Sequence, residues 1–456
     1  MSGGARIADK AELDAFLAAN PDIEAVQIMI TDPSGVLRGK SVRREELDRI
    51  YDSGRQVAGS ILGLDITGED VDATGLVWDT GDADMCARPI AGTLVRAPWL
   101  TAPTGQLMLT MFDSKGAPAA ADPRHALVRA VDSLASRGFT PVVACEIEFY
   151  LLREEPGGRL VPAGGGRASE RQKIDAYSLQ RLDDLAPLFS DVYAAARAQG
   201  LPAETLMSEY SPGQFEITLH HRADAMRAVD EAVMFKRLLR GVAQKHGLIA
   251  CFMAKPFTQR AGSGLHVHVS LADSTGRNLF ASDDPSGTPM LRHAIGGMKE
   301  VMADSLAIFA PNANSYRRFV SRSYAPIAPI WGINNRSVSL RVPTGPPVSR
   351  HIEHRIAGAD ANLYLAVAAV LAAAARGIER ELDPGPPVEG NGYEQAGERQ
   401  LPGSWRRAIM VAERSDFLRE ALGADFMKIF LAIKLQECTR FSAEVSELDY
   451  AWYLRN

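Results

Sequence analysis

Apolar and polar positions change their spacing several times in the first third of the chain. Residues 11–19 place apolar side chains at helical intervals, whereas 25–31 (AVQIMIT) is a run typical of a strand. Residues 32–35 (DPSG) favour a turn, and a second strand-like run follows at 36–42. We therefore predict a helix and then a β-hairpin, with a further strand at 106–112.

A turn-rich segment at 113–118 separates this part from the rest of the chain, and we predict a domain boundary there. Asp122 followed by Pro123 is typical of the start of a helix. Strand-like and helix-like stretches alternate from that point onward, which predicts a mixture of helices and sheet. Two stretches rich in Gly and Pro, 156–166 and 383–403, are predicted to be surface loops.

The composition is typical of a globular enzyme. The chain has 456 residues, of which 46% are hydrophobic and 23% are charged, enough for two or three domains with buried cores. Its 50 Lys and Arg stand against 56 Asp and Glu, a formal net charge of −6, and no basic stripe is present. These values exclude a disordered or fibrous chain, and we expect no nucleic-acid partner.

Two further features predict the compartment. The four cysteines, Cys86, Cys145, Cys251 and Cys438, lie far apart without metal-type spacing, so we expect buried, reduced thiols. The first residues lack the apolar core of a signal peptide, and no run reaches the ~18 apolar residues of a membrane helix. We therefore expect a cytoplasmic protein without a membrane partner.

Acidic residues stand inside an apolar, strand-like run at 142–150. Glu146 and Glu148 are two positions apart, so a strand would point both side chains to the same face. Burying two like charges side by side is costly unless a cation neutralises them. The alternative is a strand face exposed to solvent, where the two carboxylates need no partner.

Two later segments have the same character. Glu209 and Glu216 flank a Pro-Gly turn that allows the two carboxylates to converge, although paired glutamates around turns are common. His266 and His268 share one face of a predicted strand and follow glycines that allow a ligand to approach the backbone. The alternative for each histidine is a hydrogen-bonded core residue.

A basic group completes the set. Arg336 and Arg341 lie in one strand-like segment, Arg318 lies upstream, and Glu353 and Arg355 alternate on a later strand. Guanidinium groups fit the geometry of phosphate and carboxylate. The alternative for any one of these arginines is a surface ion pair.

Together these residues favour phosphoryl-transfer chemistry. Sites rich in carboxylate with a single imidazole suit Mg²⁺ or Mn²⁺ rather than zinc. Two such cations beside arginines would bridge phosphate oxygens and neutralise developing charge. The sequence contains no Gly-x-x-x-x-Gly-Lys-Ser/Thr loop. The residues therefore predict an enzyme that uses ATP and a divalent metal and is not a P-loop protein.

In these motifs and their order, the sequence resembles the glutamine synthetase superfamily over nearly its whole length. The motifs are CEIEFY at 145–150, Glu209 with GQFE at 213–216, KPF at 255–257, GSGLHVHVS at 262–270, NSYRR at 314–318, NRSVSLRVP at 335–343 and EHR at 353–355. The segments most similar to the γ-glutamylpolyamine (γ-glutamylputrescine) synthetase branch are LRGK at 37–40, GLDITG at 63–68, GDAD at 81–84 and GADAN at 358–362.

The resemblance implies an α+β fold in two domains. Residues 20–115 would form an N-terminal β-grasp domain, and 120–456 a glutamine-synthetase-type catalytic α/β domain. The active sites would lie between neighbouring subunits of a homo-oligomer, a dodecamer of two hexameric rings. Residues 57–68 would then lie beside the catalytic residues of the adjacent chain.

The resemblance also implies a role for each site residue. One Mg²⁺ or Mn²⁺ ion would be held by Glu148, Glu209 and Glu216, and the other by Glu146, His266 and Glu353. Glutamate would be bound by Gly262, Arg318 and Arg355, with Tyr324 beside the entrance for the amine. ATP would contact Glu204, His221, His268, Ser270, Arg336 and Arg341. The catalytic steps would involve Arg336, Arg318 and Glu353.

Two positions depart from the ammonia-using members of the family. Their Asp-Gly-Ser-Ser stretch corresponds to 57–61 (VAGSI), which has no acid, and Tyr324 stands where they carry a flap glutamate. The loss of both carboxylates removes stabilisation of ammonium and favours a larger amine, whose alkyl chain gains from burial. Asp65 and Glu69 are candidates to bind the distal ammonium of a diamine, the alternative being that both are ordinary surface acids.

We therefore expect an ATP-dependent ligase that joins the γ-carboxylate of glutamate to putrescine or another polyamine through γ-glutamyl phosphate, in amine catabolism. The alternatives are the same chemistry with ethanolamine, a monoalkylamine, an aromatic amine or ammonia, and a structural relative without activity. The complete set of predicted metal ligands argues against the structural relative, because such a protein has no need for so many buried carboxylates.

Overall fold

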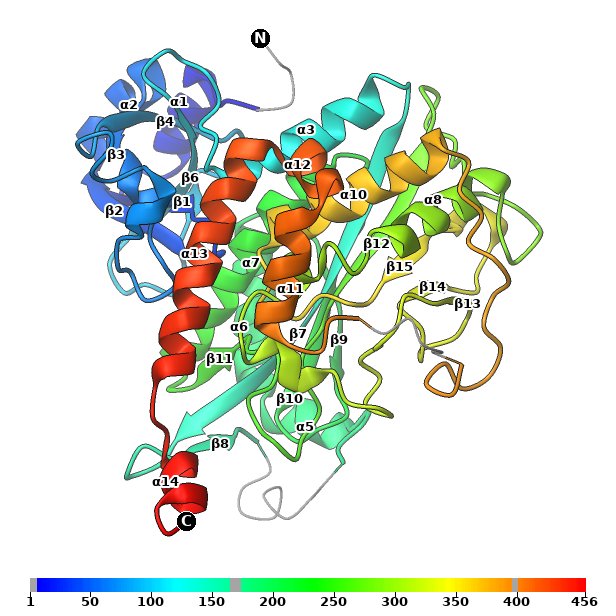
Figure 1. The fold of residues 1–456 in the computed structure, drawn as a ribbon. Coiled ribbons are helices and arrows are strands. Elements are labelled where there is room, and N and C mark those ends of the chain that lie inside the picture. The colour runs from blue at the N-terminus through cyan, green and yellow to red at the C-terminus, as the bar shows by residue number, and fades with distance from the viewer. Residues whose placement is uncertain (1–5, 165–173, 396–400) are drawn as a thin grey trace.

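The computed structural model describes residues 6–164, 174–395 and 401–456 (Figure 1). This described part contains two β-sheets, one of six strands and one of nine, with most of the helices packed around the larger sheet. The smaller sheet comes from the first third of the chain, and the larger from the remainder. The predicted mixture of helices and sheet is confirmed.

The smaller sheet begins with the predicted hairpin. Asp32 Oδ1 accepts a hydrogen bond from the Val36 N–H at 2.8 Å, and Gly35 has a φ of +81°, which suits glycine in the turn. The strand order is β2-β1-β6-β4-β3, with β5 also paired to β6. Its strands are β1 (Ala25–Thr31), β2 (Leu37–Arg43), β3 (Arg55–Ala58), β4 (Asp84–Pro89), β5 (Val95–Arg96) and β6 (Thr104–Phe112). The helices beside it are α1 (Lys10–Ala19) and α2 (Leu47–Ser53).

The larger sheet has the strand order β13-β14-β15-β12-β7-β10-β9, and β8 and β11 also pair with β7. Its strands are β7 (Thr140–Glu154), β8 (Leu160–Pro162), β9 (Ala203–Ser208), β10 (Gln214–Leu219), β11 (Ile249–Cys251), β12 (Leu265–Ala272), β13 (Trp331–Ile333), β14 (Leu340–Val342) and β15 (Ile352–His354). The surface loop predicted at 156–166 is wrong in part, because β8 pairs with the end of β7. Residues 165–166 of that loop, and 396–400 of the loop predicted at 383–403, lie outside the described residues.

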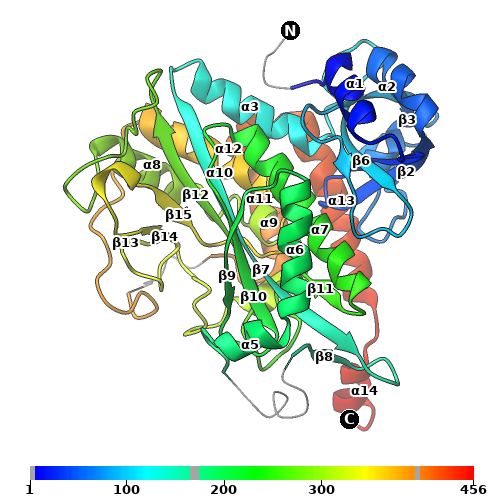
Figure 2. The same cartoon turned by 180° about the vertical axis from the view of Figure 1, so that it is seen from behind.

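Most of the helices of this part of the chain pack against one face of the sheet or against one another, whereas α14 projects from the body. The helices are α3 (Pro123–Ala135), α5 (Leu179–Asp184), α6 (Ala186–Ala198), α7 (Ala225–Lys245), α8 (Pro289–Glu300), α9 (Leu306–Phe309), α10 (Leu363–Glu379), α11 (Trp405–Arg414), α12 (Asp416–Leu422), α13 (Ala424–Ala443) and α14 (Glu447–Tyr453). Asp122 caps α3 as predicted, accepting from the Arg124 N–H at 2.9 Å. The buried helix α10 contacts α3 and α8, while α6 and α7 run along the sheet (Figure 2). Among the described helices, none combines the length and the apolar character needed to cross a bilayer.

Short 3₁₀ turns connect several of these elements. They are η2 (Arg44–Glu46), η3 (Gly59–Leu62), η4 (Asp72–Thr74), η5 (Ser315–Arg318) and η6 (Pro347–Ser349).

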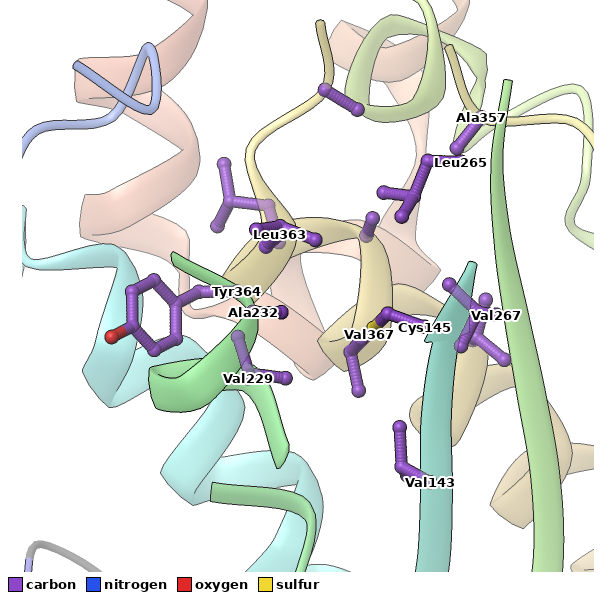
Figure 3. Close-up of a cluster of buried hydrophobic side chains, with 14 of the residues drawn as sticks. Val143, Cys145, Val229, Ala232, Leu265, Val267, Ala357, Leu363, Tyr364 and Val367 are labelled. Carbon is purple, nitrogen blue, oxygen red and sulfur yellow. The ribbon is translucent and has the colours of Figure 1, made fainter. Parts of the chain in front are cut away.

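One face of β7 is buried against the helices. Val143 and Cys145 point toward α7 and α10, where they belong to one hydrophobic cluster with Val229 and Val367 (Figure 3). Because side chains alternate along a strand, the even-numbered residues of β7 project from the opposite face. The core thus determines which face of the sheet carries the acidic residues. Cys145 and Cys438 are buried as predicted, whereas the same prediction is wrong for Cys86 and Cys251, which are half-buried.

Candidate active site

A cavity of about 650 Å³ lies over the larger sheet, on the face opposite the one that packs against the helices. The predicted site residues that line this cavity are Glu146, Glu148, Glu209, Glu216, Gly262, His266, Arg318, Tyr324, Arg336, Arg341, Glu353 and Arg355. Residues that are widely separated in the sequence therefore share one space.

Strand pairing brings the acids and the histidine side by side. Strand β7 lies between β12 and β10, so Glu146 is opposite His266 on one side and Glu148 is opposite Glu216 on the other. Strand β15 pairs with β12 and adds Glu353. Neighbouring side chains on one face of a sheet lie close enough to interact, and these five converge.

His266 lies at the centre of this cluster. Its Nδ1 is 3.1 Å from Glu146 Oε2 and 3.6 Å from Glu353 Oε1. The groups whose ligand atoms all lie within 4.8 Å of one another are Glu146, His266 and Glu353, and Glu148, Glu216 and His266. The first group, Glu146, His266 and Glu353, is the set that we predicted for one metal ion. In the other group His266 stands where we predicted Glu209, which lines the cavity nearby.

The charges of the cluster are unevenly compensated. Burial raises the pKa of Glu216 well above its usual value, and the neighbouring carboxylates add to the rise. Burial and the charge of Glu148 raise the pKa of Glu209 to about 7. At Glu353 burial is again the largest single effect, but Arg355, His266 and His268 together outweigh it and lower the pKa to about 2. Among the described residues, Glu209 and Glu216 form no ion pair with Lys or Arg, and with the imidazole of His266 they offer a donor set that fits Mg²⁺ or Mn²⁺.

Arginines border the carboxylates on one side. Arg341 Nη1 donates to Glu353 Oε2 at 2.8 Å, and Arg355 donates to Glu353 Oε1. Arg336 lines the same cavity. The cavity therefore joins a cluster that suits a cation to a cluster that suits an anion.

Arg318 is held in place by the backbone. Its guanidinium group donates to the carbonyl of Ile356 at 3.1 Å and to that of Ala357 at 2.7 Å, and the residue is 4% exposed. A Cβ atom at Gly262 would lie 2.6 Å from Arg318 Cγ, so glycine is the residue that leaves room for this side chain. Two of the three residues that we predicted to bind glutamate are thus packed together.

Four residues that we predicted to contact ATP lie outside the lining of this cavity, and they are Glu204, His221, His268 and Ser270. His268 Nε2 is 3.0 Å from Glu146 Oε1, so this histidine contacts the acidic cluster without lining the cavity. Glu204 Oε1 is 2.6 Å from His220 Nδ1, and the rings of His220 and His221 lie 4.2 Å apart. The contacts of these residues with ATP stay predictions.

The comparison with known proteins agrees with this geometry. The family described as glutamine synthetase, catalytic domain, matches residues 120–453. The chain belongs to the glutamine synthetase family. Its fold is accordingly of the glutamine synthetase type.

Individual relatives are similar over almost their whole lengths. Gamma-glutamylputrescine synthetase from Escherichia coli (strain K12) is 37% identical over 450 residues, which cover 98% of this chain and 94% of that protein. Gamma-glutamylethanolamide synthetase from Streptomyces coelicolor is 32% identical and covers 97% and 94% of the two chains. Glutamate–isopropylamine ligase from a Pseudomonas species is 31% identical and covers 95% of each. The solved structure of GmaS with ADP has a TM-score of 0.85 at 27% identity and covers 97% and 99%.

Gln214 is a residue of this glutamine synthetase site that our sequence analysis did not select. It is 1% exposed, and its Nε2 donates to the Gly262 carbonyl at 3.0 Å and to Glu148 Oε2 at 3.3 Å. It therefore ties a predicted metal ligand to the glycine loop. Its position two residues before Glu216, on the same strand face, was the signal that could have identified it.

Lys255 and Arg260 also line the cavity and were not selected. Both lie in or just after the KPF motif at 255–257, which was used to recognise the family but was given no role. Each places a basic side chain on the wall of the cavity.

The two features that we predicted to distinguish this chain from ammonia-using glutamine synthetases lie in different places. Tyr324 lines the cavity, is 62% exposed and has a φ of +58°. Residues 57–61, by contrast, are not among the described residues that line the cavity of the same chain. Only Tyr324 can therefore face a substrate within one chain.

Asp65 and Glu69, the candidates for binding a distal ammonium, are both engaged by Arg440. Asp65 is 0% exposed, accepts from the N–H groups of Thr67 at 2.8 Å and Glu69 at 3.0 Å, and forms an ion pair with Arg440. Glu69 Oε1 is 2.8 Å from Arg440 Nη2. Asp65 is thus neither a free acid for an amine nor an ordinary surface acid, since it fixes its own loop.

Proposed function

We propose that this protein is an ATP-dependent ligase that joins the γ-carboxylate of glutamate to an amine, with putrescine or another polyamine as the acceptor, in amine catabolism. Similarity to a gamma-glutamylputrescine synthetase, a gamma-glutamylethanolamide synthetase and a glutamate–isopropylamine ligase supports ligation of glutamate to an amine larger than ammonia. The observation that carries the proposal is the single cavity in which a carboxylate–histidine cluster meets buried arginines.

Binding of glutamate is assigned to Gly262, Arg318 and Arg355. Arg318 is fixed by the Ile356 and Ala357 carbonyls, so its position is set before the substrate arrives. ATP is assigned to Arg336 and Arg341 in the cavity, with Glu204, His221, His268 and Ser270 as further contacts. Glu146, Glu148, Glu209, Glu216, His266 and Glu353 would hold two Mg²⁺ or Mn²⁺ ions, which would neutralise phosphate oxygens.

The reaction takes place in two steps. The γ-carboxylate of glutamate attacks the terminal phosphate of ATP, which releases ADP and leaves γ-glutamyl phosphate. The amine nitrogen then attacks the acyl carbon, the bond to phosphate breaks, and a proton leaves the nitrogen. Arg336 and Arg318 offset the negative charge that develops on the transferred group, and Glu353 keeps Arg341 and Arg355 oriented.

The expected amine acceptor follows from two carboxylates that the chain lacks. No acid stands at Val57 or Ala58, and Tyr324 occupies the flap position, so neither position stabilises ammonium or accepts its proton. The apolar part of the tyrosine instead suits an alkyl chain. Because Arg440 engages Asp65 and Glu69, selection of a diamine needs another acid at the entrance, and an adjacent subunit would supply it.

The assembly belongs to the same proposal. We infer an N-terminal β-grasp domain over 20–115, a catalytic domain over 120–456, and a cytoplasmic dodecamer of two hexameric rings. In that arrangement residues 57–68 would complete the site of a neighbouring chain. The parallel pairing of β1 with β6 beside the β1–β2 hairpin supports a β-grasp arrangement.

The test is phosphate release and amide formation with glutamate, Mg²⁺ and ATP across putrescine, propylamine, ethanolamine, an aromatic amine and ammonia. We expect putrescine to give the highest kcat/KM, and Glu148→Ala to abolish turnover and the stabilisation by Mg²⁺ with nucleotide. Equal efficiency with ammonia and putrescine would contradict the amine-ligase assignment, and a better result with propylamine would contradict only the polyamine part. A protein that is inactive with every amine, and whose melting temperature does not change when Mg²⁺ and nucleotide are added, would favour a structural relative without activity.

A further inference from the structure

A strained loop forms one wall of the cavity. Arg322, Ser323, Tyr324 and Ala325 all line the cavity. Arg322 has a φ of +61° and Tyr324 a φ of +58°, a region that residues with a Cβ atom rarely adopt. Two such residues in one short loop need contacts from elsewhere to hold them in place.

Tyr393 supplies such a contact from a distant part of the chain. Its hydroxyl donates to the Ala325 carbonyl at 3.0 Å. Burial raises the pKa of the Tyr393 phenol, so the hydroxyl keeps its proton for this bond. Tyr393 therefore holds Ala325, the residue after Tyr324, although it does not itself line the cavity.

The segment that carries Tyr393 is itself anchored. The Gly392 N–H donates to Ser337 Oγ at 2.8 Å, and Asn335 Nδ2 donates to the Gly390 carbonyl at 2.9 Å. Asn335 and Ser337 flank Arg336, which lines the cavity. The strained loop is thus connected through Tyr393 to the segment that presents this arginine.

We propose that Tyr393 is a positioning residue that latches the 322–325 loop over the cavity, so that the amine can bind and water is kept from the acyl phosphate. This inference rests on the proposed function. When the latch is lost, water in place of the amine attacks the acyl carbon of γ-glutamyl phosphate. The bond between that carbon and the phosphate oxygen breaks, and glutamate, inorganic phosphate and a proton are released.

The test is Tyr393→Phe, which keeps the ring and removes the hydroxyl. A neutral hydrogen bond changes an equilibrium by a factor of about two to ten, so the KM for the amine should rise by about that factor. The phosphate released per amide formed should rise as well. The KM for ATP should stay at the wild-type value, because the bonds of Asn335 and Ser337 with Gly390 and Gly392 do not involve the Tyr393 hydroxyl. The melting temperature should also stay at the wild-type value, because residues 322–325 lie outside the hydrophobic clusters. Tyr51→Phe removes a hydroxyl that contacts Glu12 at 3.5 Å beside the smaller sheet and should match wild type.

A second variant tests the role of strain. Arg322→Gly removes the conformational cost at that position, so the latch should matter less in its background. Tyr393→Phe should therefore raise the amine KM less in Arg322→Gly than in wild type, and equal increases would overturn the inference. An unchanged amine KM and an unchanged ratio of phosphate to amide in Tyr393→Phe would also overturn it. The inference would also be overturned if Tyr393→Phe raised the KM for ATP as much as the KM for the amine, or lowered the melting temperature. A wild-type protein that forms no amide fails the proposed function, whereas an active wild type with an unaffected Tyr393→Phe fails the latch alone.

Discussion

Gly262 leaves the space that the Arg318 side chain fills. A Cβ atom at this position would lie 2.6 Å from the Ala254 carbonyl oxygen as well as 2.6 Å from Arg318 Cγ. The backbone cannot yield easily, so the arginine would have to move. Since the Arg318 guanidinium group is 4% exposed and bonded to carbonyls, a displaced side chain would lose its contacts.

Gly262→Ala should therefore raise the KM for glutamate by about ten- to a hundredfold, with a smaller effect on the KM for ATP. Steady-state kinetics with each substrate varied in turn measure the difference. Gly403→Ala is the matched control, because no heavy atom lies within 4 Å of a Cβ built there and its φ is not positive. A glutamate KM within twofold of wild type in Gly262→Ala would contradict the packing of these two residues.

His354 is a buried histidine next to Glu353, in surroundings that do not stabilise a charged imidazole. It is 2% exposed, its ring lies 4.6 Å from that of Phe309, and its Nδ1 has no hydrogen-bond partner among the described residues. Burial lowers the pKa of His354 to about 3, with a further contribution from His266.

Because the folded protein keeps His354 neutral while the unfolded chain protonates it below pH ~6.5, this residue should destabilise the fold as pH falls from 6.5 toward 3. The sign follows from proton binding, since the unfolded state binds more protons over that interval. His354→Phe should lack this contribution. As the pH falls from 7 to ~5, the melting temperature of wild type should therefore fall more than that of His354→Phe. A constant difference between the two proteins across these pH values would refute the neutral, buried histidine.

At the scale of elements, α13 fastens the smaller sheet to the rest of the chain. Lys434 Nζ donates to Glu437 Oε2 at 2.7 Å and to Ser34 Oγ in the hairpin turn at 3.0 Å. Glu437 Oε1 also accepts from the Ile66 N–H at 2.8 Å. Both charged side chains are almost fully buried, so each depends on the other.

Glu437→Ala should lower the free energy of unfolding by about 3–5 kcal/mol, because it leaves a buried ammonium unpaired. The double variant Lys434→Met/Glu437→Leu should cost less than Glu437→Ala, since no charge remains to be compensated. Urea denaturation followed by fluorescence compares them. Lys10→Ala, which breaks exposed pairs with Asp14 and Asp48, should lower the free energy of unfolding far less than Glu437→Ala does, because solvent screens charges at the surface. If the double variant were the least stable of the three, the charge argument would be wrong.

At the scale of the whole molecule, apolar surface is concentrated at the C-terminal end. The exposed apolar residues in and around α14 are Val445, Leu448, Tyr450, Trp452, Tyr453 and Leu454. Figure 1 shows this helix projecting from the body below α13. Patches of this kind on a folded chain mark contact surfaces, and a ring oligomer of identical chains would cover them.

Light scattering on the active protein should therefore give a particle of several hundred kilodaltons, about 590 kDa for twelve chains of 49.3 kDa. Activity and the large particle should disappear together on dilution, because a neighbouring chain is proposed to complete each site. A monomer with full activity would refute the assembly.

The sequence by itself determined the features that depend on neighbouring positions. The DPSG turn predicted the hairpin, Asp122 and Pro123 predicted the start of α3, and the spacing of two predicted that Glu146 and Glu148 share a face. Each of these depends on local geometry, so the pattern was sufficient. The order of the motifs was enough to identify the family.

Only the tertiary structure decided which segments meet. Strand β7 lies between β12 and β10, and this arrangement places His266 against Glu146 and Glu216 against Glu148. The pairing register of distant strands is set by packing of the whole sheet, which no local pattern encodes. For the same reason the sequence suggested a free acid at Asp65, and only the fold revealed that Arg440, from the far end of the chain, already neutralises it.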